Sequence, residues 1–197
     1  MTASENTLAS GKFFRFWSAA NEPRAVVLIS HGLGEHSGRY EHVAAALTAD
    51  NLDVYAPDHI GHGKSPGKPA YIDRFSDLTS GVSELRDHIR RHHAGLPVIL
   101  IGHSMGGLIA IRLALGAHAD YAGLILTGPL LGLPDTPSRL QVMLLRVLSV
   151  LAPTIKATEI DASAVSRDPA VVSDYIADPL VHHDNIPART VVSLFDE

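Results

Sequence analysis

Residues 96–118 read LPVILIGHSMGGLIAIRLALGAH, and this stretch decides the fold. It opens with a continuous apolar run, turns through a glycine-rich segment around Ser104, and continues with apolar residues at helical spacing. A continuous apolar run is typical of a strand buried on both faces, so the stretch predicts a strand, a sharp turn and a helix. A turn of this kind with the pattern G-x-S-x-G exposes the serine hydroxyl at the carboxyl end of an α/β sheet. We therefore interpret Ser104 as a catalytic nucleophile; the alternative is a packing turn that contains a serine by chance.

The same alternation of strand and helix extends outward from this segment. Buried strands are expected at 25–30, 53–56, 97–101 and 121–127. Helices with one apolar face are expected at 40–51, 75–93 and 105–118. Strands that alternate with helices predict a mostly parallel sheet with helices on both faces, joined by right-handed crossovers.

The character of the sequence changes after Gly128-Pro129. Proline recurs, no further strand run is evident, and helices are expected at 138–151 and 169–177. We predict a core over residues 1–128, a helical cap over 129–190, and the start of a return to the core at 191–197.

Composition excludes several classes of function. The 197 residues carry a net charge of −5 without a basic block, which argues against nucleic acid as a partner. The chain has no cysteine, so disulfides, thiolate chemistry and cysteine-based metal sites are excluded. The first residues lack the pattern of a signal peptide, and no apolar run approaches the roughly 20 residues that span a bilayer. We expect a cytoplasmic location.

A second motif, Ser30-His31-Gly32-Leu33-Gly34, follows directly after the first buried strand. An oxyanion hole needs two N–H donors, one of which comes from a loop beside the nucleophile. We expect these donors to be the backbone amides of Leu33 and Met105. His31 is expected to order the loop, since it precedes Ser104, whereas the catalytic histidine of this fold follows the serine.

Four segments together resemble a known family. HGLGEHSGRY (31–40), PDHIGHGKS (57–65), GHSMGG (102–107) and AVSRDPAVVSDYIADPLVHHD (164–184) are similar to segments of the monoacylglycerol lipase group, within the serine aminopeptidase S33-like α/β-hydrolases. The resemblance covers about residues 15–190. It implies an α/β-hydrolase fold with a helical cap and a serine ester hydrolase that cleaves fatty-acid monoesters of glycerol through an acyl-enzyme. No cofactor is implied.

The resemblance also assigns roles to individual residues. It implies Ser104 as the nucleophile and the amides of Leu33 and Met105 as the oxyanion donors. Glu35 and Arg39, within GEHSGRY, match residues at the polar end of the family's site. We interpret them first as a structural ion pair and second as substrate-binding residues.

Two residues of the family's triad find no match. The family's acid lies on a strand after the cap, in an HGxxD-like segment, and its histidine lies nearer the C-terminus; neither motif is in this chain. We therefore expect a truncated chain that lacks the last strands of the sheet and is inactive alone. The strand at 121–127 would then be an exposed apolar edge through which the chain self-associates.

The cap helix at 138–151 informs the substrate class. Its wide apolar stripe includes Leu144 and Leu148, which we expect to bind an acyl chain or to rest on a membrane surface as a peripheral contact. The alternative is a helix buried against the core. His182-His183 does not complete a metal site, so no metal is expected.

Other functions stay open at this stage. One is a different α/β-hydrolase activity: lysophospholipase, carboxylesterase or prolyl-type aminopeptidase. The other is a truncated, non-catalytic protein that binds acyl ligands or a partner. The missing acid and histidine favour the second alternative for this chain, whereas the apolar cap helix favours a lipid ester as the substrate.

Overall fold

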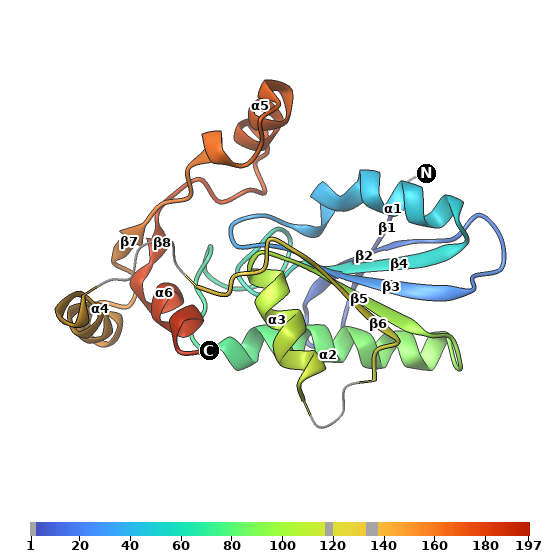
Figure 1. The fold of residues 1–197 in the computed structure, drawn as a ribbon, viewed down its shortest axis with the longest axis horizontal. Helices are drawn as coiled ribbons and strands as arrows, with labels where there is room; N and C mark the ends of the chain where they lie inside the picture. The colour runs from blue at the N-terminus through green and yellow to red at the C-terminus, as the bar shows by residue number, and fades with distance from the viewer. Residues whose placement is uncertain (1–2, 117–119, 133–137) are drawn as a thin grey trace.

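A six-stranded sheet forms the centre of the computed structural model, which describes residues 3–116, 120–132 and 138–197 (Figure 1). Its strand order is β1-β2-β4-β3-β5-β6. The strands are β1 (Ser4–Thr7), β2 (Phe13–Trp17), β3 (Ala25–Ser30), β4 (Leu52–Pro57), β5 (Val98–His103) and β6 (Gly123–Thr127). Strands β3 to β6 are parallel, and β1 and β2 join antiparallel at one edge. The parallel part confirms the prediction, whereas the β1–β2 hairpin was not predicted.

Helices cover both faces of the sheet, as expected. Helix α1 (Glu41–Ala49) lies on one face, and α2 (Phe75–His92) and α3 (Met105–Ala114) lie on the other (Figure 1). Successive side chains of β3 divide between the two faces: Val26 and Leu28 pack toward α2 and α3, whereas Val27 and Ile29 pack toward α1. This two-sided burial explains why the strand reads as an unbroken apolar run.

Two helix boundaries differ from the predictions. The helix expected at 40–51 begins as a 3₁₀ turn, η1 (Ser37–Tyr40), before α1. Helix α3 ends at Ala114, and the last predicted residues, 117 and 118, lie outside the described part of the chain.

The part of the chain from residue 138 onward lies beyond the carboxyl ends of β3 and β5 (Figure 1). It contains α4 (Arg139–Leu151), η2 (Ala162–Ala164), α5 (Pro169–Ala177) and α6 (Ala188–Phe195). It also contains a small antiparallel pair, β7 (Lys156–Thr158) and β8 (Ile186–Pro187). The prediction of no further strand after 129 was therefore wrong, because these two strands are too short to give an apolar run. We refer to residues 138–187 as the cap segment.

Helix α6 attaches the cap segment to the core. Thr190 Oγ1 accepts a hydrogen bond from the backbone N–H of Ile72 and donates to the carbonyl of Ala70. Ser193 Oγ donates to the Ile72 and Asp73 carbonyls. In the described residues no helix has the length and apolarity needed to cross a membrane.

Candidate active site

Ser104 stands at a sharp turn between β5 and α3. Its backbone has φ 52° and ψ −117°, a conformation that is strained for a residue with a side chain. The flanking glycines are required by packing: a Cβ on Gly102 would lie 2.8 Å from the Cβ of Ala110, and one on Gly106 would run into the Ser30 carbonyl. The turn predicted from the sequence is therefore present, with its serine at the carboxyl end of β5.

Two backbone amides near this serine have no acceptor among the residues that the structure describes. Met105 N–H belongs to the first turn of α3, where no carbonyl of the same helix can accept it. Leu33 N–H donates to no acceptor in the described residues. Its loop lies against the turn, since a Cβ on Gly32 would be 3.3 Å from Ser104 Cβ. The loop that carries Leu33 and the first turn of α3 thus both lie beside Ser104. The role of the two amides as oxyanion donors stays a prediction.

Glu35 braces the loop that carries Leu33. One carboxylate oxygen accepts hydrogen bonds from Gly32 N–H and from the Tyr40 hydroxyl, each at 2.7 Å. The other oxygen lies 3.4 Å from Arg39 Nε, so the predicted ion pair is present. Arg39 also lies over the ring of Tyr175 on α5, 4.8 Å from its centroid. A substrate-binding role for Glu35 and Arg39 stays a prediction.

Three buried imidazoles underlie the same loop. His31 Nδ1 lies 2.7 Å from the Gly32 carbonyl, and its Nε2 accepts the backbone N–H of His59 at 3.0 Å. His59 Nε2 bonds to Ser30 Oγ, and His62 Nδ1 bonds to a backbone carbonyl. The ring centroids of His59 and His62 lie 4.2 and 5.4 Å from that of His31. Burial lowers the pKa of all three imidazoles, to about 3 for His62, which keeps them neutral.

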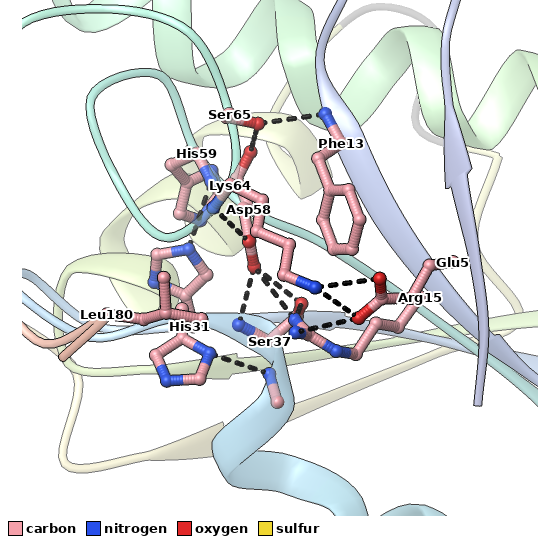
Figure 2. Close-up of polar contacts among 12 residues, drawn as sticks. Glu5, Phe13, Arg15, His31, Ser37, Asp58, His59, Lys64, Ser65 and Leu180 are labelled. Carbon is pink, nitrogen blue, oxygen red and sulfur yellow. Dashed lines mark hydrogen bonds and ion pairs between the residues drawn. The ribbon is translucent and has the colours of Figure 1, made fainter. Parts of the chain in front are cut away.

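A buried carboxylate fixes the neighbouring loops, as Figure 2 shows. Asp58 Oδ1 accepts the backbone N–H and the hydroxyl of Ser37, while Oδ2 accepts the backbone N–H of Lys64. Arg15 on β2 lies 3.6 Å from Asp58 Oδ1, and its Nη2 reaches Glu5, which also pairs with Lys64 Nζ. The motif at 57–65 did not by itself indicate a role for Asp58. An acidic residue directly after a buried strand was the one available signal.

The cap segment contacts the loop that carries Leu33. His36 Nε2 and Asp178 Oδ2 are 2.8 Å apart, and the backbone N–H of His182 donates to the Gly34 carbonyl at 2.8 Å. The Ile160 side chain packs against Gly34, since a Cβ added there would lie 2.9 Å from its Cδ1. These contacts join residues more than 120 positions apart, and no local motif predicts them.

Comparisons with known proteins agree with this geometry. The family model for serine aminopeptidase, S33, matches residues 21–197. The chain belongs to the S33 family. It is 42% identical to the monoacylglycerol lipase of Mycolicibacterium smegmatis, over 87% of this chain and 61% of that protein. It is 39% identical to the human monoglyceride lipase, over 86% of this chain and 56% of that protein. The chain thus spans about three fifths of the length of these curated relatives.

A solved structure supports the fold of this S33 family member. The crystal structure of the Paleococcus ferrophilus monoacylglycerol lipase matches all of this chain and 70% of that chain, with 34% identity and a TM-score of 0.76. The fold is therefore an α/β-hydrolase fold, as the sequence predicted.

An apolar cavity of about 440 Å³ opens beside Leu33 in this S33 family chain. Its apolar walls come from α3, the segment after β6, and α6, and include Leu33, Leu108, Leu130, Ile186 and Leu194. Leu144 and Leu148 do not line it; Leu144 is 56% exposed on α4 and Leu148 is half-buried. The structure therefore does not join these two leucines to the cavity, and their role in substrate binding stays a prediction.

Ser104 Oγ has no hydrogen-bond partner among residues 3–116, 120–132 and 138–197. The neighbouring His103 bonds through Nδ1 to the carbonyl and hydroxyl of Thr127, each at 3.0 Å. Asp196 pairs with Arg146 at 2.6 Å. The residues that the structure describes contain no group of three side chains that could ligate a metal ion.

Proposed function

We propose that the site belongs to a serine hydrolase of the monoacylglycerol lipase type, whose substrates are fatty-acid monoesters of glycerol. The observation that carries the proposal is the strained turn that presents Ser104 beside the amides of Leu33 and Met105, which have no acceptor among the described residues. The names of the relatives, monoacylglycerol and monoglyceride lipases, supply the substrate class. The apolar cavity beside Leu33 suits the acyl chain of such an ester.

In the proposed reaction, Ser104 Oγ attacks the ester carbonyl carbon while its proton passes to a base. The carbonyl oxygen becomes an oxyanion that accepts hydrogen bonds from the Leu33 and Met105 amides. The carbon–oxygen bond to glycerol then breaks, glycerol leaves with a proton, and water hydrolyses the acyl-serine to release the fatty acid.

A base in contact with Ser104 is the component that the described residues do not supply. Loss of triad function costs roughly 10⁴–10⁶ in rate, and an oxyanion hole alone leaves residual catalysis. We therefore propose that this chain by itself turns over esters very slowly.

The test separates nucleophilic reactivity from turnover. The chain and a Ser104→Ala variant are incubated with a fluorophosphonate and, separately, with a p-nitrophenyl ester. We expect slow phosphonylation of Ser104, located by peptide mass spectrometry, absent in Ser104→Ala, and negligible ester turnover. Labelling at another residue, or equal labelling of both proteins, would refute the assignment of Ser104. Rapid turnover that Ser104→Ala abolishes would refute the proposed inactivity of the isolated chain.

The cap segment supplies a proposed membrane contact. Helix α4 leaves a set of large apolar side chains exposed: Leu140, Met143, Leu144, Val147, Val150 and Leu151. Arg139 and Arg146 lie on the same helix, so anionic lipid headgroups would be attracted to it. We propose that this face rests on a lipid surface as a peripheral contact.

A non-catalytic role is the second candidate. The apolar cavity, together with the lack of a base against Ser104, is also compatible with a protein that binds fatty acids without hydrolysing esters. Binding of a fluorescent fatty acid to Ser104→Ala, with no phosphonylation of the native chain, would favour this role over hydrolysis.

A further inference from the structure

The Gly32–Leu33 peptide carries the loop's proposed oxyanion donor. A trans peptide is planar, so its C=O and N–H point in opposite directions. The group that holds the Gly32 carbonyl therefore also decides where Leu33 N–H points. In the structure that group is the imidazole of His31, whose Nδ1 lies 2.7 Å from the Gly32 oxygen.

The backbone of His59 decides which nitrogen of His31 bears the proton. His59 N–H can only donate, and it donates to His31 Nε2 at 3.0 Å (Figure 2). Nε2 must therefore be unprotonated, and the single proton of the neutral ring lies on Nδ1, where it is donated to the Gly32 carbonyl. Complete burial of the ring lowers its pKa and so favours this neutral form.

The peptide on the other side of Gly32 is fixed as well. Gly32 N–H donates to Glu35 Oε1 at 2.7 Å, and Glu35 is held in turn by Tyr40 and Arg39. Both peptides that meet at Gly32 are thus held by side chains, whereas Leu33 N–H has no partner in the described residues. With the Gly32 carbonyl directed at the buried imidazole, Leu33 N–H points away from it.

We propose that His31 is a positioning residue: its Nδ1–H holds the Gly32 carbonyl so that Leu33 N–H faces the oxyanion formed at Ser104, and the backbone of His59 selects the required tautomer. This inference rests on the proposed function for its catalytic consequence. Its structural part, the tautomer and the orientation of one peptide, stands independently of catalysis.

The first experiment tests the tautomer without any need for activity. A two-dimensional NMR spectrum that correlates the carbon-bound ring protons of His31 with its ring nitrogens is recorded on the ¹⁵N-labelled chain at neutral pH. We expect a protonated nitrogen at Nδ1 and an unprotonated one at Nε2. A proton on Nε2, or on both nitrogens, would overturn the proposal.

The second experiment compares His31→Asn with His31→Leu. An asparagine amide places an N–H donor close to the position of Nδ1, whereas leucine offers none, and both lose the acceptor for His59 N–H. Removal of an oxyanion donor costs about 10²–10³ in rate, so we expect phosphonylation of Ser104 to slow at least tenfold in His31→Leu. His31→Asn should stay within about threefold of the native rate.

Two controls make the outcome decisive. His92→Asn, on the exposed side of α2, reports any general effect of removing an imidazole, and urea unfolding shows whether the His31 variants have equal stability. Equal rates in all variants, or an asparagine variant as slow as the leucine variant at equal stability, would refute the proposal. If the native chain is not phosphonylated, the proposed function fails. The Leu33 amide resonance, exchange-broadened in His31→Leu but not in His31→Asn, then decides the positioning role.

Discussion

At the scale of single residues, the conformation of Ser104 is the feature with the clearest energetic cost. Only Asn51, Ala70 and Ser104 combine a side chain with positive φ in the described residues, and the ψ of Ser104 is far from the left-handed helical minimum. Such strain costs about 1–3 kcal/mol and persists only where the surroundings enforce it. Here Ser104 N–H donates to the Thr127 carbonyl, and Leu130 N–H donates to the Ser104 carbonyl.

This strain predicts that Ser104→Gly is more stable than Ser104→Ala. Glycine adopts the observed φ without a steric penalty but loses more chain entropy on folding, so a net advantage of about 1 kcal/mol is expected. Urea unfolding of the two variants at the same pH measures it. An alanine variant as stable as the glycine variant would show that the turn is unstrained.

At the scale of elements, sequence patterns predicted the parts of the fold whose residues bury themselves locally. Examples are the strands β3 and β5 and the helix α2. Each buries a continuous or periodic set of apolar residues, so its pattern in the sequence distinguishes strand from helix. The four residues of strand β1, SENT, are polar and exposed, and they form a strand because their backbone pairs with β2. Backbone pairing of this kind leaves no apolar pattern to read.

Helix α4 is not buried against the core, which was the alternative to a lipid-binding helix. Its buried residue is Ser149, and the half-buried Val142 and Leu145 lie against α6, while the wide apolar stripe is exposed. The apolar stripe is visible in the residue order, but the contacts of α4 with α6 decide which part of it is covered.

The exposed stripe predicts that Leu144→Glu weakens lipid binding. Cosedimentation with vesicles of phosphatidylcholine and phosphatidylglycerol should fall severalfold, because a carboxylate replaces apolar contact and repels anionic headgroups. Ile176→Glu on α5, where an exposed apolar side chain is also replaced, is the matched control and should bind nearly as the native chain does. Equal losses in both variants would remove α4 as the specific contact. In an active form of the protein, Leu144→Glu should reduce hydrolysis of long-chain esters more than that of short soluble ones.

At the scale of the whole molecule, the site was predicted only in part. The turn at Ser104 follows from a local motif, as does the position of the Leu33 loop beside it; the role of the Leu33 and Met105 amides as oxyanion donors stays a prediction. The Asp58 network and the His36–Asp178 pair arise from segments far apart in the chain. Their partners are defined by tertiary packing alone, and one sequence without packing information holds no signal for such pairs.

The buried imidazoles predict acid sensitivity of the whole fold. His31, His59 and His62 stay neutral when folded because burial lowers their pKa, whereas in the unfolded chain they take up protons below about pH 6.5. Stability from this source is therefore complete above pH 6.5. It falls as the pH decreases toward the folded-state value of about 3 for His62. Each imidazole contributes up to about 1.4 kcal/mol per pH unit.

Urea unfolding at about pH 7.5, 6 and 5 measures this loss of stability, because these values lie on both sides of the ordinary pKa of histidine. His62→Phe should reduce the slope below pH 6 by roughly one third of the part that the three buried imidazoles contribute, since one of their three protons is removed. His42→Gln, at an exposed position, is the control and should leave the slope unchanged. A stability that stays constant from pH 7.5 to pH 5 would contradict the prediction.

The free edge of β6 predicts self-association. In the described residues β6 pairs with β5 alone, and Leu124 and Ile125 are 39% and 49% exposed. An exposed apolar edge strand pairs readily with another chain, so the weight-average mass in sedimentation equilibrium should rise with concentration. Ile125→Lys should suppress this rise, whereas Leu115→Lys, at an exposed position directly after α3, should not. A weight-average mass that stays at the monomer value at all concentrations would refute the predicted self-association.

The bonds between the cap segment and the loop at 34–36 limit how freely caps can be exchanged between relatives. His36 meets Asp178, and Gly34 meets His182, so the transplanted segment must match a loop that lies outside it. A chimaera that takes residues 138–187 from another family member will keep the pair with His36 only if that segment carries a hydrogen-bonding side chain at the position of Asp178. The bond between His182 and Gly34 joins two backbone groups, so it persists through any change of side chain that leaves the backbone in place. The residue at 178 is therefore the one to match when a cap segment is transplanted onto this core.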